Sequence, residues 1–202
     1  NNYAAQFALN NKFGSESLFE IAFSASDNPG RDGLAYSMHW WGYADIVATK
    51  DFVDLMAEDP DDIRCQLLDQ VYNGQEIEQN IRYWLMKYPG TSYGVPSVEN
   101  NYMVFRLSEV YLIAAEAGLK AGGEYRSPAL SYLNDIVSRA NPDKSVSDAE
   151  FTLDRVLKER RKELVGEGHR YFDALRNNQT IIRKGGWHLD GIPEEINWDY
   201  TK

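Results

Sequence analysis

The chain has 202 residues, and its 21 lysines and arginines against 31 aspartates and glutamates give a formal net charge of −10. Hydrophobic residues at 43% and charged residues at 26% are typical of a globular protein, which excludes disorder for most of the chain. The acidic balance argues against a nucleic-acid partner and against docking on anionic lipid through a basic face. No apolar run reaches the length of about 18 residues that a membrane-spanning helix needs.

Cysteine and histidine are scarce, whereas aromatic residues are abundant. The one cysteine, Cys65, excludes an internal disulfide, and a lone cysteine is most often a small buried hydrophobe. Aromatic residues make up 13% of the chain against three histidines, which favours stacking and packing over acid–base catalysis. The chain begins at Asn1 without a Met or the basic and apolar segments of a secretory signal, so we interpret it as a piece of a longer polypeptide.

The first half of the chain predicts short elements joined by loops. Apolar residues at helical spacing predict the end of a helix within residues 1–15, and the alternating pattern of residues 17–24 predicts a strand. Residues 25–50 predict a long loop in which turn residues are interleaved with aromatics, and loops of this length are usually functional. Thr49 is expected to cap a helix over about residues 50–58.

The second half of the chain predicts an antiparallel helical hairpin. Residues 102–121 have apolar side chains every three or four positions, which predicts one amphipathic helix ended by Gly122. Ser127 is expected to cap the next helix, which ends at Asn141. The predicted fold class is therefore mainly α, with a helical hairpin scaffold, long loops and a few short strands.

A run of charged residues, 158–163, lies within a third helix that is predicted over about residues 153–165 behind Thr152. One interpretation is a solvated helix face with ion pairs between residues four apart. The other is a set of buried arginine–carboxylate pairs that join helices, to which Arg170 and Asp173 would also contribute. Both interpretations are structural, and we favour them over a catalytic site.

The sequence contains no motif of catalysis or of cofactor binding. It lacks the glycine patterns that bind dinucleotides or phosphates and the nucleophile elbow of hydrolases. His169 and Asp173 lie four residues apart, yet no third residue has the spacing of a metal ligand. We therefore expect no catalytic residue, no metal and no cofactor, although a glycosidase pair among the 31 acidic residues stays open as an alternative.

The sharpest candidate for binding is a group of ring side chains within the long loop, namely Tyr36, His39, Trp40, Trp41 and Tyr43. A flat ring stacks on the apolar C–H face of a sugar while polar neighbours bond its hydroxyl rim, which predicts a glycan site. The alternative is that these rings anchor the loop onto the core, because Trp is highly buried on average. Trp187, which follows two glycines, is a weaker second candidate.

Three further blocks of sequence stand in a characteristic order: Val104–Ala117 (VFRLSEVYLIAAEA), Leu133–Ala140 (LNDIVSRA) and Glu159–Arg176 (ERRKELVGEGHRYFDALR). Together they resemble the C-terminal region of the SusD/RagB family, the nutrient-binding lipoproteins on the surface of Gram-negative bacteria. The strand-like segment Ser17–Ser24 is similar to the strand that precedes the variable loops of that family. The resemblance covers most of the chain.

The resemblance implies a SusD-like helical fold and a binding function without catalysis. Members capture glycans, such as starch, on the outer face of the outer membrane and deliver them to a SusC-like TonB-dependent transporter. In some branches the ligand is a peptide, so a peptide-capturing RagB-like subunit is the alternative. Ligand residues vary among members, and the aromatic candidates above therefore rest on our own argument from the loop.

The resemblance also implies how the chain is organised. Residues 1–202 would form the C-terminal region of a longer protein, with residues 25–50 as a variable loop within it. An N-terminal helical-repeat half and a lipid-bearing cysteine would lie upstream, and Cys65 is not that cysteine. Contact with the membrane is expected through that lipid anchor alone.

Overall fold

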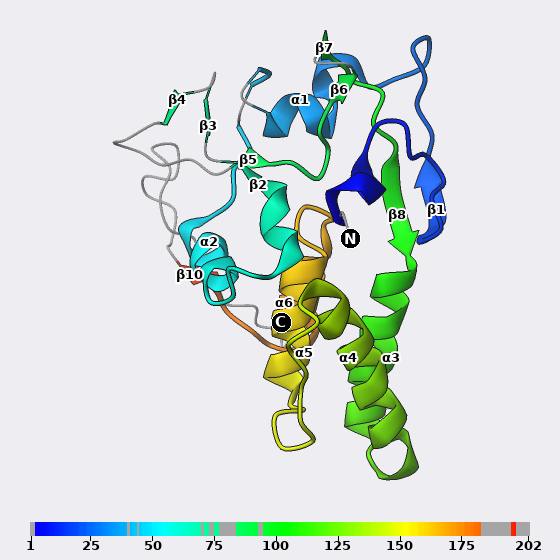
Figure 1. Cartoon of the computed structure of the whole chain (residues 1–202), viewed down its shortest axis with the longest axis vertical. Coiled ribbons are helices and arrows are strands. Elements are labelled where there is room, and N and C mark those ends of the chain that lie inside the picture. The colour runs from blue at the N-terminus through cyan, green and yellow to red at the C-terminus, as the bar shows by residue number, and fades with distance from the viewer. Residues whose placement is uncertain are drawn as a thin grey trace.

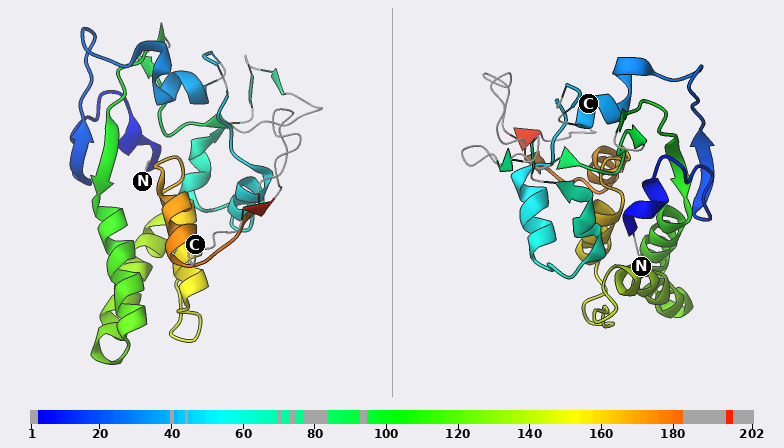
Figure 2. Two further views of the ribbon diagram at one scale, coloured as in Figure 1. Left: turned by 180° about the vertical axis from the view of Figure 1, so that it is seen from behind. Right: turned by 45° about the horizontal axis from the view of Figure 1, so that its top comes forward.

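The computed structural model describes residues 3–39, 41–43, 45–69, 71–72, 75–76, 84–92, 95–182 and 195–196. Helices α3 to α6 gather at one end of the molecule, and α1 lies with short strands and loops at the other end (Figure 1). The views from other directions agree with this division (Figure 2). The prediction of a mainly α fold with a few short strands is confirmed. Within the described ranges, no helix has both the length and the apolar character needed to cross a membrane.

The N-terminal segment differs in part from its prediction. A short 3-10 helix, η1 (Tyr3–Phe7), stands where the end of a longer helix was expected. The predicted strand is confirmed as β1 (Ser17–Ile21), which pairs antiparallel with β8 (Tyr102–Arg106). The prediction that residues 102–106 begin a helix is wrong, because their backbone pairs with β1 and Arg106 is still extended at φ −142°.

The long loop of residues 25–50 contains two helical segments, η2 (Gly30–Asp32) and α1 (Leu34–Met38). The helix predicted after it is confirmed as α2 (Lys50–Ala57), and the Thr49 side chain accepts a hydrogen bond from the backbone N–H of Phe52. This cap satisfies one of the free N–H groups of the first turn. A sequence of short elements follows, namely η3 (Ile63–Leu67), β2 (Leu68–Asp69), β3 (Val71–Tyr72), β4 (Gln75–Glu76), β5 (Trp84–Leu85), β6 (Thr91–Ser92) and β7 (Val95–Pro96).

The predicted hairpin is confirmed as α3 (Leu107–Ala121) and α4 (Arg126–Ala140), joined by η4 (Gly123–Tyr125). The helices approach closely, because a Cβ atom on Gly118 would lie 2.5 Å from the Cβ of Ala129. The prediction that Ser127 caps α4 is wrong. The helix begins two residues earlier than such a cap would give, at Arg126, since η4 leads into it with helical backbone angles and no side-chain cap is needed.

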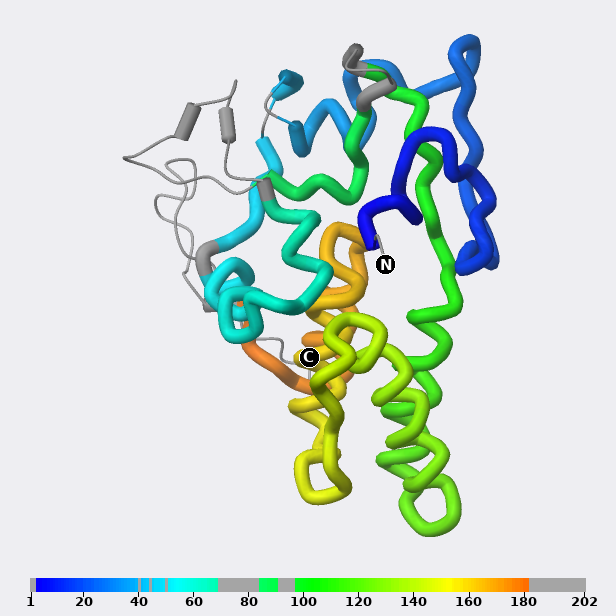
Figure 3. Tube along the Cα trace, viewed as in Figure 1, coloured from blue at the N-terminus to red at the C-terminus, as the bar shows by residue number. Residues whose placement is uncertain are grey.

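The main core lies between this hairpin and the next helix, α5 (Leu153–Glu163), which Thr152 caps as predicted. Its fully buried residues include Leu112, Leu133 and Val156. After α5 the chain reverses through a glycine-containing turn into α6 (His169–Arg176), as the trace in Figure 3 shows. The described part ends with β9 (Ile181–Ile182), which pairs with β10 (Glu195–Ile196).

Candidate ligand-binding site

The structure brings four of the predicted ring side chains together in one group, which we call the aromatic cluster: Tyr36, His39, Trp41 and Tyr43. The Tyr36 ring meets Trp41 edge-on at 5.4 Å and Tyr43 edge-on at 4.9 Å between ring centroids. The His39 ring stacks on Trp41 at 5.2 Å, with 22° between the two planes. These geometries are the favourable ones for aromatic pairs, so the rings hold one another in place.

The backbone folds the loop back onto α1 and so sets the positions of the rings. The N–H of Tyr43 donates to the carbonyl oxygen of Tyr36 at 2.8 Å, and the N–H of Ile46 donates to that of Ser37 at 3.1 Å. A Cβ atom on Gly42 would lie 2.0 Å from the Tyr36 carbonyl oxygen, so only glycine fits there. The loop is therefore held by main-chain contacts as well as by its rings.

The aromatic cluster is buried at one side and exposed at the other. His39 is 2% exposed, and the partly buried Trp41 packs against a core cluster that includes Met38, Leu85 and Tyr88. Tyr43 is 53% exposed. The packing interpretation therefore applies to His39 and Trp41, which anchor the loop to the core, whereas Tyr43 presents its ring to solvent. The glycan site itself stays a prediction.

Two of the predicted site residues, Trp40 and Trp187, lie outside the described residues, so their part in the site stays a prediction. Two contacts of the cluster had no sequence signal that pointed to them. The guanidinium of Arg31 lies 5.9 Å from the centre of the Tyr36 ring and covers one of its faces. Gly90 lets Trp41 approach, since a Cβ on Gly90 would lie 2.5 Å from a ring carbon of Trp41.

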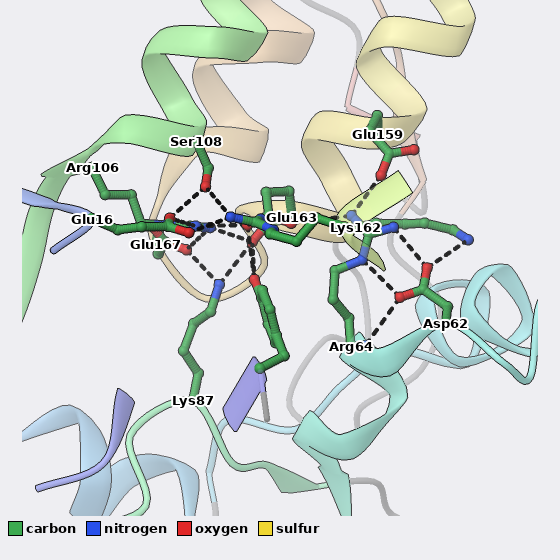
Figure 4. Close-up of polar contacts among 12 residues, drawn as sticks. Glu16, Asp62, Arg64, Lys87, Arg106, Ser108, Glu159, Lys162, Glu163 and Glu167 are labelled. Carbon is green, nitrogen blue, oxygen red and sulfur yellow. Dashed lines mark hydrogen bonds and ion pairs between the residues drawn. The ribbon is translucent and has the colours of Figure 1, made fainter. Parts of the chain in front are cut away.

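The charged run on α5 belongs to a buried ionic network (Figure 4). Glu163 is fully buried and accepts hydrogen bonds from Arg106 at 2.6 Å and from Arg139 at 2.6 Å. Arg64 contacts Glu163 at 3.2 Å and Glu159 at 2.6 Å. The interpretation as a solvated helix face is wrong, because most of the charged run is buried, namely Glu159, Arg160, Lys162 and Glu163. Buried arginine–carboxylate pairs are confirmed.

This network also holds the segment on which Trp41 packs. Lys87, which follows β5, donates to the backbone carbonyl oxygen of Glu163 at 2.9 Å and pairs with the Glu167 carboxylate. Burial lowers the pKa of Lys87 to about 8, although the charge of Glu167 opposes the shift. Tyr88 and Gly90, against which Trp41 packs, lie one and three residues after Lys87. The ion pairs of the helical end therefore hold the segment on which the aromatic cluster rests.

A second set of pairs joins α5 to α6. Asp173 accepts hydrogen bonds from Arg160 at 2.9 Å and from Arg176 at 2.7 Å. The sequence pair of His169 and Asp173 is therefore not presented as two free ligands of a metal. Across the residues that the structure describes, no group of three or more potential ligands is placed to hold a metal ion. Cys65 is partly exposed rather than fully buried, and burial still raises the pKa of its thiol.

Comparisons with known proteins place the chain in a family. The family model described as the SusD family matches residues 67–202. A SusD superfamily protein from Bacteroides vulgatus is 50% identical with a TM-score of 0.90, over 98% of this chain and 44% of that chain. A putative sugar binding protein from the same species is 36% identical with a TM-score of 0.77, over 92% of this chain and 41% of that chain.

A more distant structure shares the fold. Surface glycan-binding protein A from Bacteroides thetaiotaomicron, in complex with laminarihexaose, is 24% identical with a TM-score of 0.66, over 87% of this chain and 45% of that chain. No curated protein matches the sequence. The chain thus spans less than half the length of these solved relatives. From the family match over most of its length and the 50% identity, we conclude that this chain belongs to the SusD family.

Proposed function

We propose that the protein is a cell-surface glycan-binding subunit that captures oligosaccharides on the aromatic cluster. The observation that supports this proposal best is the exposed Tyr43 ring, held at a defined angle by Tyr36 on a loop whose backbone is fixed. A rigid ring loses little freedom when a sugar stacks on it. The family supports the same conclusion, since one relative is described as a putative sugar binding protein.

In this proposal the protein binds its ligand without converting it. A glycosidase needs one carboxyl group that gives up a proton and one that acts as base or nucleophile. The carboxylate of Glu163 does not suit the acid role. Although burial alone would raise its pKa, the guanidinium groups of Arg106, Arg139 and Arg64 hold that pKa well below the usual range. This carboxylate stays ionised and fully engaged by its partners.

The proposal extends to partner and location. The protein would deliver its oligosaccharide to a SusC-like TonB-dependent transporter in the outer membrane, on the extracellular face, with a lipid anchor upstream of residue 1. These parts of the proposal rest on membership of the SusD family. Co-purification of the full-length protein with such a transporter from outer membranes would test the partner.

The ligand is tested by titrating the full-length protein with a panel of plant, host and microbial oligosaccharides, followed by calorimetry and tryptophan fluorescence. Tyr43→Ala is the first variant, because its exposed ring can be removed without opening the core. Trp40→Ala and Trp41→Ala complete the set. Tyr125→Ala is the matched control, since Tyr125 is also exposed, at 59%, but lies at the far end of the hairpin.

We expect one glycan class to bind, and Tyr43→Ala to weaken that binding about tenfold while Tyr125→Ala leaves it unchanged. Glycan binding that is indifferent to all three cluster variants would move the site elsewhere. Binding of peptides without any glycan would replace the proposal with a peptide-capturing subunit.

A further inference from the structure

A cavity of about 560 Å³ lies between α2, α5 and α6. Its walls are largely apolar and include Phe52, Leu85 and Val165, but two arginines, Arg161 and Arg170, also line it. The volume is that of a typical small-ligand pocket, and a few charged groups within apolar walls are the usual composition of such sites.

These two arginines differ from the other buried or half-buried arginines of the chain. Arg64, Arg106 and Arg139 each contact at least one carboxylate. Arg161 is partly buried, and although the charge of Asp51 acts on it, it makes no hydrogen bond or ion pair with any residue in the described ranges. Arg170 donates to the side-chain oxygen of Gln179 at 2.8 Å and has no ion pair within those ranges.

The charge in the pocket is only partly compensated. Burial lowers the pKa of both side chains, and the charge of Arg161 lowers the pKa of Arg170 further. The charges of Asp51 on Arg161 and of Asp173 on Arg170 oppose these shifts without reversing them. The acidic residues on the same walls are Asp51 and Asp173, and Asp173 is already bound by Arg160. Neither guanidinium has an ion pair within the described residues, although Arg170 donates to Gln179 and the charge of Asp51 acts on Arg161. Each partly buried charge is therefore incompletely compensated, which is costly unless an anion supplies a partner.

Arg160 adds a third guanidinium to the lining of the pocket. It is 4% exposed, and its Nη1 atom is buried without a hydrogen-bond partner among the described residues. Three guanidinium groups therefore stand against two carboxylates on these walls, in a chain whose net charge is −10. A local excess of positive charge inside an acidic protein attracts an anion.

We propose that this pocket binds an oxyanion group, a carboxylate or a sulfate on an acidic oligosaccharide, through Arg161 and Arg170. The planar guanidinium fork pairs with either group through two parallel hydrogen bonds, and the apolar walls strengthen those bonds by excluding water. The anion site stands on the pocket itself, and only the identity of its carrier as a glycan rests on the proposed function.

The pocket lies next to the aromatic cluster along the chain. Helix α1 contributes Tyr36 to the cluster and Met38 to the pocket wall, and Ile46 of the pocket donates its backbone N–H to Ser37. The same segment thus shapes both sites. An oligosaccharide with stacking faces and an acidic substituent has the chemistry that the two sites recognise.

The experiment is calorimetric titration of the full-length protein with four oligosaccharides of matched length: a polyuronate, its methyl ester, a sulfated form and a neutral form. The variants are Arg161→Gln and Arg170→Gln. Lys144→Gln is the matched control, because it removes one positive charge from an exposed site outside this pocket.

We expect the polyuronate or the sulfated form to bind, and each arginine variant to weaken that binding about tenfold. Lys144→Gln shows whether the loss comes from the overall charge of the protein, and we expect this control variant to bind normally. The methyl ester shows whether the ligand needs its negative charge, and we expect it to bind as weakly as the neutral form. The preferred anion tells a uronate carboxylate from a sulfate ester.

Two further outcomes keep the proposal separate from the proposed function. Equal binding of all four forms, or acid binding that survives both arginine variants, would overturn the anion site and leave the glycan function standing. Acid binding that depends on the arginines but not on the aromatic cluster would support the anion site alone. If no form binds, the anion site is overturned, while the proposed function is decided by the wider oligosaccharide panel described above.

The stability of the variants distinguishes a ligand site from a structural one. Arg161→Gln breaks no ion pair that the structure shows, so we expect its melting temperature to equal that of the wild type. A pronounced fall in that temperature would show that Arg161 serves the fold, and would count against the anion site.

Discussion

The side-chain nitrogen of Lys87 lies 2.9 Å from the backbone carbonyl oxygen of Glu163, and both residues are almost completely buried. This contact joins the segment beneath the aromatic cluster to the last turn of α5, 76 residues further along the chain. The loop-rich end of the molecule is thus fastened to the helical end through polar groups, which require particular positions, rather than through apolar contact alone. The close-up in Figure 4 shows Lys87 reaching up to the network from below.

Glu163→Gln should destabilise the protein strongly. The substitution removes the negative charge that faces Arg64, Arg106 and Arg139, and it leaves those buried guanidinium groups undercompensated. Loss of one partner of a buried ion pair costs about 3–5 kcal/mol. Urea unfolding of the variant measures the loss. Glu124→Gln, on an exposed residue without such partners, is the control and should be neutral. A loss for Glu163→Gln no larger than that of the control would contradict the network's role.

Lys87 should make stability depend on pH in the alkaline range. Burial first, and then the charge of Arg106, lower its pKa from 10.5 to about 8, against the opposing pull of Glu167. The unfolded chain therefore binds more protons than the folded chain between pH 8 and 10.5, so this residue's contribution to stability rises with pH there.

The measurement compares wild-type protein with Lys87→Met in denaturant titrations from pH 7 to 9.5. We expect the unfolding free energy of the wild type, relative to that of the variant, to rise by about 1–2 kcal/mol between pH 7 and 9.5. The upper limit avoids the range in which tyrosines ionise in the unfolded chain. A difference that stays constant with pH would show that the pKa of Lys87 is not lowered.

Gly42→Ala should disturb the aromatic cluster. The new methyl group would lie 2.0 Å from the carbonyl oxygen of Tyr36, which is backbone and part of α1. The loop must move, so we expect glycan binding to fall and the protein to lose about 1–3 kcal/mol of stability. Gly14→Ala is the control, because its methyl group meets only the side chain of Asn11, which can turn away. Normal ligand affinity in Gly42→Ala would show that the loop geometry does not matter.

Arg106→Lys should be far from conservative. Arg106 is completely buried and donates to both carboxylate oxygens of Glu167 at 2.9 Å and to Glu163 at 2.6 Å. A lysine has one charged nitrogen and cannot span these acceptors. We expect a loss of about 2–4 kcal/mol in thermal or chemical unfolding. The exposed pair of Arg126 and Asp148 provides the comparison, since Arg126→Lys should change stability by less than about 1 kcal/mol. Equal losses of stability for Arg106→Lys and Arg126→Lys would argue against a special role for the several hydrogen bonds of the Arg106 guanidinium.

Local sequence patterns predicted the longer helices and the family, although not the short α1 within the expected loop. The 3.6-residue period and the capping threonines located α2 and α5 to within about two residues, because helix formation depends on neighbours along the chain. The same period misplaced residues 102–106, where an apolar segment continues the helical pattern by coincidence. Pairing with β1, some 85 residues away along the chain, makes that segment a strand.

The clustering of rings within eight residues also came from the sequence, since Tyr36 and Tyr43 are close in the chain. The sequence did not show which of those rings face solvent. His39 is covered and Tyr43 is open because distant segments, including the one that contains Gly90, pack against one side of the loop. Burial is a property of neighbours in space, and no period within the loop encodes it.

The charged residues of α5 show most clearly what the sequence determines and what only the tertiary structure decides. The sequence by itself determined that acidic and basic residues are interspersed along α5, and it left two structural interpretations open. Only the tertiary structure decided that Glu163 lies among three arginines while Arg161, two residues earlier, faces a cavity without a carboxylate contact in the described ranges. The reason is physical: a helix turns about 100° per residue, so adjacent charges meet different neighbours, and those neighbours come from distant parts of the chain.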